Sequence, residues 1–362
     1  MQAELIYNPS GGQVIIRREL GNVIALLENR GWSVTTRETS KPMEATELAR
    51  GAVARGAAVV IAAGGDGTVN EVANGLVGTD AALGVLPVGT TNSWALQMGI
   101  PTLKPMLPGT QAAKLLAGLE ERMPRPFPIN YYRKVLLDAA RVLVEGFTVA
   151  VDVGELSGRY FLISAGVGLE AEIIQSISPK EKRALGSWAY VLTAIESAYH
   201  YAGTEVCLNL DGHVLNVSTP LIVVSNIQLY GGMMAIGPMA CVNDGKLDVC
   251  IFKGEGFFTF VQHGMRVLSH RHLKDPKVEY YQCREIAVES ARPLPVHVDG
   301  DPFTSTPVVI RSVPSSLKVI IPEIVPGGLF ASSTCASRRQ SPADEEKATD
   351  TRKRQQVRSR RL

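Results

Sequence analysis

The first third of the chain alternates short apolar runs with segments of helical periodicity. Between the runs, apolar residues recur at the three- and four-residue spacing of one helix face. Repeated strand–helix units of this kind predict a parallel sheet, with ligands bound beyond the C-terminal ends of the strands. The expected strands are Glu4–Tyr7, Trp32–Thr36, Val59–Ile61 and Leu83–Leu86.

The pattern changes from about residue 125, where helical periodicity fades and short alternating runs dominate. Asp211-Gly212 lies between two such runs and is a hairpin signal. We therefore expect a second, mostly antiparallel β-rich domain, interrupted by helices near Gly186–Tyr201 and Phe257–Leu268. The last expected strand, Leu317–Ile321, would return to the first domain.

The predicted fold class is an N-terminal α/β domain with a parallel sheet, followed by this β-rich domain. The chain has 362 residues, which suits two domains. We expect the first domain to span residues 1–125, completed by 308–325, and the second to span 126–307. Residues 326–362 would form a disordered basic tail, because their Ser, Arg, Gln and Glu side chains bury little apolar surface.

Charge and cysteine content narrow the functional classes. Residues 331–362 carry nine Lys/Arg and four Asp/Glu, so the rest of the chain has a net charge of −3 within a total of +2. A body without excess positive charge argues against nucleic-acid binding. Five cysteines without a CxxC pair predict reduced thiols in a cytoplasmic protein, and no signal peptide or membrane span is expected.

The stretch Val59–Leu76 predicts a strand, a glycine-rich turn and the start of a helix. Glycines would let the backbone approach a ligand closely and adopt positive φ. The free N–H groups at a helix start favour an anion such as phosphate. Asp66 fits beside phosphates if it acts through a cation, most simply Mg²⁺.

Three loops rich in glycine or threonine follow strands of the predicted parallel sheet. Because the C-terminal strand ends share one edge, the loops should converge on one crevice and form a nucleotide site. They are residues 8–12, 64–68 and 89–92.

The run GGDGTVNEV, which begins at Gly64, closely resembles the nucleotide loop of diacylglycerol, sphingosine and NAD kinases and, more distantly, of phosphofructokinases. Its continuation Asn70-Glu71 favours the lipid kinases. The resemblance to the diacylglycerol/sphingosine lipid-kinase catalytic domain extends over about residues 3–325 and implies ATP as phosphate donor. The implied ATP-binding residues are Asn8, Pro9, Ser10, Gly11, Gly12, Thr39, Gly65, Asp66, Gly67, Thr68, Val69, Asn70, Glu71 and Thr90.

The same resemblance implies metal ligands and a general base. Asp66 and Asp152 would organise the Mg²⁺ that accompanies ATP. A structural divalent ion would bind the Asp244 carboxylate and the backbone carbonyls of Cys241 and Lys246. In His297–Asp301 the family has D-G-E, whose last carboxylate removes the proton from the lipid hydroxyl. That position is Asp301 here, and Asp299 would support Asp301 or interact with magnesium.

This chain departs from the family pattern at three positions. Asp301 is one methylene shorter than the usual Glu, Ser93 stands where Asp is common, and Gln13 replaces a basic residue. Read locally, Asp299-Gly300 and Asp244-Gly245 are also ordinary Asp-Gly turns.

The favoured hypothesis is ATP- and Mg²⁺-dependent phosphorylation of the hydroxyl of diacylglycerol or a related lipid. The lipid would be taken from the inner membrane surface, on which the cytoplasmic protein would bind transiently. A homodimer is left open. The alternatives are an NAD kinase-like enzyme, a sphingoid-base or ceramide kinase, and a catalytically weak lipid or nucleotide sensor.

Overall fold

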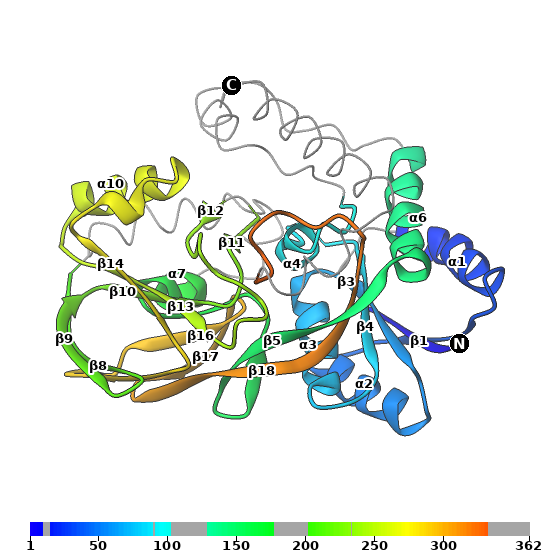
Figure 1. Cartoon of the computed structure of the whole chain (residues 1–362), viewed down its shortest axis with the longest axis horizontal. Helices are drawn as coiled ribbons and strands as arrows, with labels where there is room; N and C mark the ends of the chain where they lie inside the picture. The colour runs from blue at the N-terminus through cyan, green and yellow to red at the C-terminus, as the bar shows by residue number, and fades with distance from the viewer. Residues whose placement is uncertain (10–14, 90, 103–128, 177–201, 233, 332–362) are drawn as a thin grey trace, which may run out of the picture. The chain divides into compact units, whose positions relative to one another are not determined.

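The structure is a computed structural model that describes residues 1–9, 15–89, 91–102, 129–176, 202–232 and 234–331 (Figure 1). The chain divides into two units, Met1–Leu329 and Phe330–Leu362, and every helix and strand named here lies in the first. The expected helix near 186–201 and nearly all of the expected tail lie outside the described residues.

The N-terminal part of the first unit alternates strands and helices, as the sequence pattern predicts. Its strands pair in parallel in the order β2-β1-β3-β4. The elements are β1 (Gln2–Tyr7), α1 (Ile15–Glu28), β2 (Ser33–Glu38), α2 (Glu44–Ala54), β3 (Val59–Gly64), α3 (Asp66–Leu76), β4 (Ala82–Pro87), α4 (Ser93–Gln97) and α6 (Ile129–Glu145).

Helices cover both faces of this sheet. Every residue of β3 and β4 is buried, which requires partners on both sides of the two strands. The helix α2 packs against α3, and α1 packs against α6. The contact between α2 and α3 is close because small residues form it. A Cβ on Gly75 would lie 2.6 Å from the Ala49 Cβ. This packing holds α3, which begins immediately after the C-terminal end of β3.

The remainder of the unit is mostly antiparallel. Its elements are β5 (Phe147–Leu156), β6 (Arg159–Phe161), β7 (Ser164–Gly168), α7 (Leu169–Ser176), β8 (Thr204–Leu210), β9 (His213–Thr219), β10 (Leu221–Ser225), β11 (Leu229–Tyr230), β12 (Met234–Ala235), β13 (Leu247–Phe252), α10 (Phe257–Leu268), the 3-10 turn η1 (His272–Lys274), β14 (Val278–Cys283), β15 (Glu285–Ser290), β16 (Pro295–Val298), β17 (Asp301–Ser305) and β18 (Val308–Ile321).

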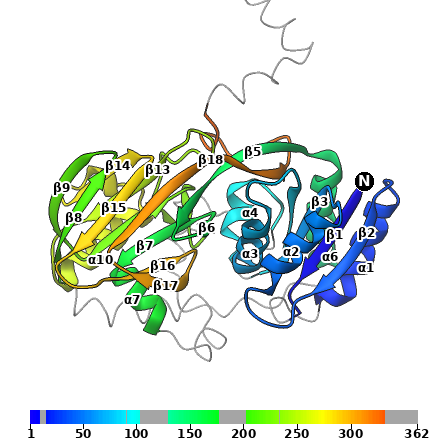
Figure 2. The same ribbon diagram turned by 90° about the horizontal axis from the view of Figure 1, so that it is seen from below.

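The long strand β18 joins the two parts. It pairs in parallel with β4 through Lys318 and Val319, and antiparallel with β5 and β15. The last strand therefore returns to the first sheet, as expected. Figure 2 shows β9, β8, β15 and β18 side by side in the continuation of that sheet. The expected domain boundary at residue 125 stays a prediction, and α6, which follows it, packs against α1 and β4.

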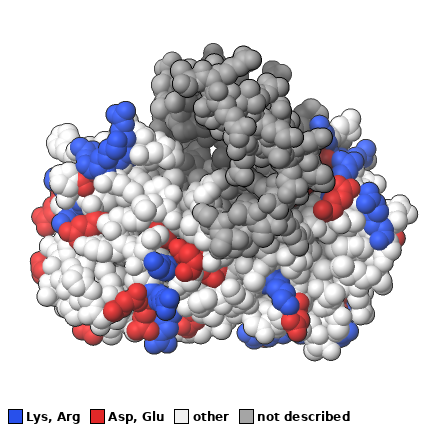
Figure 3. All heavy atoms as spheres, viewed as in Figure 1, with Lys and Arg blue, Asp and Glu red and all other residues white. Residues whose placement is uncertain are grey.

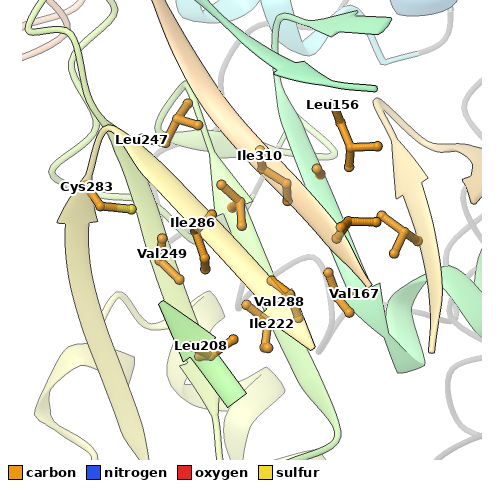
Figure 4. Close-up of a cluster of buried hydrophobic side chains, with 14 of the residues drawn as sticks. Leu156, Val167, Leu208, Ile222, Leu247, Val249, Cys283, Ile286, Val288 and Ile310 are labelled. Carbon is orange, nitrogen blue, oxygen red and sulfur yellow. The ribbon is translucent and has the colours of Figure 1, made fainter. Parts of the chain in front are cut away.

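A β-sandwich core lies between this sheet and a six-stranded sheet of order β14-β13-β10-β7-β16-β17. Figure 4 shows apolar side chains of both sheets meeting in one cluster. Leu208, Ile286 and Ile310 come from one sheet, and Val167 and Val249 from the other. The alternating runs predicted after residue 125 are the strands of this sandwich.

Candidate functional site

The glycine-rich turn connects β3 directly to α3. Gly65 is the N-terminal capping residue, with φ −88° and ψ −175°. The expectation of positive φ at these glycines is wrong, and close contact explains their small size instead. A Cβ on Gly64 would lie 2.4 Å from the Thr68 side chain, and one on Gly89 would lie 2.4 Å from the Gly65 Cα.

The described parts of the three loops do converge. The Val88 N–H donates to the Gly64 carbonyl over 3.0 Å, which joins the loops after β3 and β4. The Thr39 N–H donates to the Tyr7 carbonyl over 3.0 Å at the ends of β2 and β1. Because β1, β3 and β4 are parallel neighbours, these loops share one edge of the sheet. Four expected nucleotide-binding residues lie outside the described residues: Ser10, Gly11, Gly12 and Thr90.

Space is open at the start of α3. Gly67 is exposed, and a Cβ built on it would meet no atom within 4 Å. The helix spans eleven residues, and its first N–H groups point out of the N-terminus. This opening beside the converging loops can accept an anionic group.

Asp66 lies at this helix start, where its carboxylate binds the next loop. Its Oδ2 accepts the Ser93 N–H over 3.0 Å and its Oδ1 accepts the Trp94 N–H over 3.1 Å, at the start of α4. Burial raises the pKa of Asp66, and these hydrogen bonds partly offset that rise. Ser93, the departure from the family pattern, thus contacts Asp66 through its backbone.

Asn70, one turn further along α3, links the helix to the β-rich part. Its side-chain amide donates to Asp299 Oδ2 over 2.6 Å and to the Tyr160 carbonyl over 3.1 Å. Asn74 on the same helix face exchanges hydrogen bonds with the Tyr160 backbone. These contacts bring the Asp299-Gly300-Asp301 turn to the helix that begins at Asp66.

Asp299 is held by backbone groups at the start of β7. Its carboxylate accepts the N–H groups of Leu162, Ile163 and Ser164, each over 2.9 Å. Burial and, to a smaller degree, the charge of Asp66 raise the pKa of Asp299 to about 6 against the lowering effect of these donors. The two carboxylates therefore lie close enough to interact across the site.

Asp301 is exposed at the start of β17 and is paired with an arginine. The Arg159 guanidinium donates to Asp301 Oδ2 over 2.7 Å, and its Cζ lies 5.3 Å from the Phe303 ring centroid. An open hollow of about 670 Å³ begins immediately after Asp301. Its lining residues are Glu172, Pro293, Pro295, Pro302, Phe303, Thr304 and Ser305.

A buried histidine contacts the Asp299-Gly300-Asp301 turn. His297 has no exposed surface, and its Nδ1 accepts the Gly300 N–H over 3.2 Å. Its Nε2 lies 3.0 Å from Glu170 Oε1 on α7, without the angles of a hydrogen bond. Gly166 leaves room for both, since a Cβ there would lie 2.3 Å from each side chain.

Asp152 joins a different group of residues. Its Oδ2 accepts the Gly245 N–H over 2.6 Å and its Oδ1 accepts the Ser315 N–H over 2.7 Å. Burial raises the pKa of Asp152, and the charge of Asp244 adds to the rise. Among the described residues, no hydrogen bond connects Asp152 to Asp66.

The turn 241–246 therefore lies beside Asp152. The Lys246 N–H donates to Asp244 Oδ1 over 3.0 Å, and Cys241 Sγ donates to the Gly328 carbonyl over 3.4 Å. No cluster of three or more His, Cys, Asp or Glu ligands is present in the described parts of the chain. The charge of Asp244 acts on Asp152, so two carboxylates lie near each other here, and carboxylate oxygens suit a hard divalent cation.

The remaining expected nucleotide-binding residues have varied surroundings. Asn8 and Pro9 follow β1 and are partly exposed, whereas Thr39, Thr68 and Val69 are buried. Glu71 contacts α2, where its Oε2 accepts the Ala45 N–H over 3.2 Å. Their roles in nucleotide binding stay predictions.

Arg159, Asn74 and the pair of Glu170 and His297 were not predicted from the sequence. Arg159 follows the Ser157-Gly158 turn and belongs to no motif, so only its contact with Asp301 marks it. Asn74 lies one helical turn after Asn70 on α3, and that spacing was the available signal for it.

Comparisons with known proteins agree with this architecture. The sequence model of the diacylglycerol kinase catalytic domain matches residues 2–123. The model of the YegS C-terminal NAD kinase beta sandwich-like domain matches residues 163–321. A crystal structure of a diacylglycerol kinase from Bacillus anthracis strain Sterne has a TM-score of 0.68 at 22% identity, over 88% of this chain and 96% of that one, and shows the shared fold.

Two curated relatives match over nearly their whole length. The diacylglycerol kinase of Bacillus subtilis strain 168 is 29% identical over 324 residues, which cover 89% of this chain and 97% of that protein. The diacylglycerol kinase of Staphylococcus carnosus strain TM300 is 27% identical over 327 residues, which cover 90% and 96%.

The α/β sheet with its glycine turn and the attached β-sandwich define the class of two-part proteins that includes diacylglycerol kinases and NAD kinase-like proteins. Within that class, this chain belongs to the diacylglycerol kinase family of lipid kinases.

Proposed function

We propose that this protein transfers the γ-phosphoryl group of ATP to the hydroxyl of diacylglycerol or a closely related lipid. The observation that carries the proposal is the Asn70–Asp299 hydrogen bond of 2.6 Å. It connects the helix start that would bind phosphate to the turn that carries Asp301. Donor and acceptor groups can therefore meet at one place.

The triphosphate would lie on the loops after β1, β3 and β4. The open space at Gly67 and the backbone contact of Gly65 with Gly89 support this position. Phosphate oxygens there would accept N–H groups from the first turn of α3 and benefit from the helix dipole. Positioning of this kind supplies much of the catalysis in phosphoryl transfer.

Asp66 and Asp299 give the site the negative charge that suits a magnesium ion. Each has a raised pKa from burial, and the charge of Asp66 further raises that of Asp299. Asp66, directly or through water, would hold Mg²⁺, which when bound neutralises phosphate charge. Asp152 is assigned instead to the second cation site, with Asp244 and the carbonyls of Cys241 and Lys246.

Asp301 would act as the general base. Its carboxylate takes the proton of the lipid hydroxyl as that oxygen bonds to the γ-phosphorus, and the bond to the leaving ADP oxygen breaks. Arg159 orients the carboxylate, and the hollow that begins at Pro302 would receive part of the lipid. Asp299 fixes the turn through its backbone hydrogen bonds.

No helix in the described parts of the chain is long and apolar enough to cross a membrane. We propose that the lipid reaches the site from a bilayer to which the protein binds reversibly. Binding at a bilayer surface is part of the proposal.

A phosphate-transfer screen tests the proposal. Purified protein is incubated with γ-labelled ATP and Mg²⁺, and with diacylglycerol, a sphingoid base, ceramide or NAD as acceptor. We expect labelled phosphatidic acid with diacylglycerol and none with Asp66→Ala. Labelling of NAD alone would support the NAD kinase-like alternative, and labelling of ceramide or a sphingoid base would reassign the lipid. No transfer to any acceptor would favour a sensor.

A further inference from the structure

The helix α10 packs one face onto the six-stranded sheet. Its buried residues are Thr259, His263 and Val267, which recur at four-residue spacing. The His263 ring contacts Phe252 of β13 edge-on, with centroids 5.3 Å apart. This face accounts for the attachment of the helix to the protein.

The opposite face of α10 is apolar and exposed. Phe258 is 86% exposed, Met265 59% and Val261 41%. Their spacing of three and four residues places them on one side of the helix. A contiguous apolar helix face that its own protein leaves in water indicates an interaction surface.

Basic residues flank this face at the end of the helix. Arg271, Lys274 and Lys277 are exposed, and within the described residues neither Arg271 nor Lys274 forms an ion pair. The acidic Asp275 is buried and paired with Arg266 over 2.9 Å, so it does not offset them at the surface. Figure 3 shows Lys and Arg side chains gathered at the upper left, where Figure 1 shows α10.

The helices α10 and α7 cover the same face of the six-stranded sheet. Gly166 pairs with Val223, and Val223 pairs with Cys250, so all three point to one face. Gly166 abuts Glu170 of α7, while Cys250 clusters with Val267 of α10. The helix α10, with its exposed apolar face, and the helix α7, whose Glu172 lines the hollow beside Asp301, thus lie in one layer on the same face of the sheet.

We propose that Phe258, Val261, Met265, Arg271 and Lys274, the α10 surface, dock the protein on a bilayer that contains anionic lipid. The proposal rests on the proposed lipid kinase function and specifies how the enzyme meets its substrate. Apolar side chains enter the boundary between headgroups and acyl chains, and basic ones contact anionic headgroups. A second copy docked symmetrically would bring like charges together, which disfavours it as the occupant.

Vesicle sedimentation of the purified protein tests the α10 surface. Phosphatidylcholine vesicles are compared with vesicles of phosphatidylcholine and phosphatidylglycerol at low salt. We expect Phe258→Ser/Met265→Ser to lower partitioning onto the anionic vesicles by at least about tenfold. We expect Arg271→Gln/Lys274→Gln to lower it by about fivefold for each residue and to leave binding to neutral vesicles unchanged.

Matched controls separate docking through the α10 surface from nonspecific adsorption to the vesicles. Ile324→Ser removes an apolar side chain that is 85% exposed elsewhere, and Lys318→Gln removes a basic one. Both should partition like the wild type. Wild-type-like binding of Phe258→Ser/Met265→Ser would overturn the proposal, as would a wild-type dimer that this double variant converts to a monomer.

Activity on diacylglycerol in neutral detergent micelles separates this proposal from the proposed function. All variants should phosphorylate micellar substrate at the wild-type rate and lose activity only on anionic vesicles. A wild type that binds anionic vesicles through the α10 surface yet phosphorylates no lipid would contradict the kinase proposal and leave docking supported.

Discussion

The side-chain nitrogen of Asn70 lies 2.6 Å from Asp299 Oδ2, although the two residues are 229 positions apart in the chain. This hydrogen bond joins the helix after the glycine turn to the turn that presents Asp301. The same Asp299 carboxylate accepts three backbone N–H groups from residues 162–164. Asp299 is therefore a positioning residue, and its contact with Asn70 couples the two halves of the site.

Asn70→Ala removes the hydrogen bond to Asp299. A hydrogen bond to a charged group contributes about 1.5–3 kcal/mol, so we expect a loss of that size in the free energy of unfolding. We also expect kcat to fall by more than about tenfold, because small misplacements of a reacting group are costly. Chemical denaturation and steady-state kinetics measure the two effects.

Thr79→Ala is a matched control for Asn70→Ala. It removes a hydrogen bond of 2.7 Å to the Leu76 carbonyl at the other end of α3. This variant should lose some stability but keep its kcat. If Asn70→Ala also kept its kcat under conditions in which it is folded, the coupling of the two halves through Asn70 would be wrong.

Gly67→Ala tests the phosphate site. Its added methyl group would enter the open space at the start of α3, where the phosphates are proposed to lie. We expect ATP to bind at least about tenfold more weakly, a loss of about 1.4 kcal/mol. The fold should not suffer, because Ala favours a helix over Gly by up to about 1 kcal/mol. Isothermal titration calorimetry with a non-hydrolysable ATP analogue measures the binding.

Gly21→Ala provides the comparison, since Gly21 is also an exposed helical glycine with open space around it. It should gain similar stability in α1 and bind ATP like the wild type. Equal ATP affinity of the two variants would place the phosphates elsewhere.

The pH dependence of stability reports on Asp299. Its pKa in the folded protein is about 6, above its ordinary value of 3.8. Between these values the folded state retains a proton that the unfolded state has lost, so ionisation destabilises the fold. The contribution of Asp299 to stability should fall by up to about 3 kcal/mol as the pH rises from about 4 to about 6, and then stay constant.

Asp299→Asn removes this dependence, although it also disturbs the hydrogen bonds. Urea denaturation from pH 4 to 7 should therefore show that the free energy of unfolding of the wild type falls with pH relative to that of Asp299→Asn. Asp80→Asn serves as a control. The hydrogen bond from Lys318 lowers the pKa of Asp80, so the contribution of Asp80 to stability rises with pH, opposite to that of Asp299. Parallel curves for the wild type and Asp299→Asn would show that Asp299 titrates normally.

Local patterns made the strands, the helices and the glycine turn predictable. The run from Val59 to Leu76 encodes its own strand, turn and helix, because apolar spacing and small residues act over a few positions. The reason for the glycines was not predictable, since it lies in the contact of Gly65 with Gly89. That contact depends on how two loops pack.

Long-range partners were beyond sequence reasoning. Arg159 meets Asp301 across 142 positions, and no periodicity or motif connects an arginine after a hairpin turn to a distant aspartate. Resemblance to a family supplied Asp301 and Asp299, and it grouped Asp152 with Asp66. The hydrogen bonds of Asp152 to Gly245 and Ser315, which only three-dimensional packing reveals, place it beside the turn 241–246, and its grouping with Asp66 stays a prediction.

The most direct test of the account replaces Asp301. Asp80→Ala is a matched control, because Asp80 is also an exposed aspartate in an ion pair of 2.7 Å. We expect Asp301→Ala to reduce phosphate transfer from labelled ATP to diacylglycerol by at least about a hundredfold, Asp301→Glu to retain or raise it, and Asp80→Ala to leave it unchanged. Full activity of Asp301→Ala, or an inactive Asp301→Glu beside an active wild type, would contradict the assignment of Asp301 as the base.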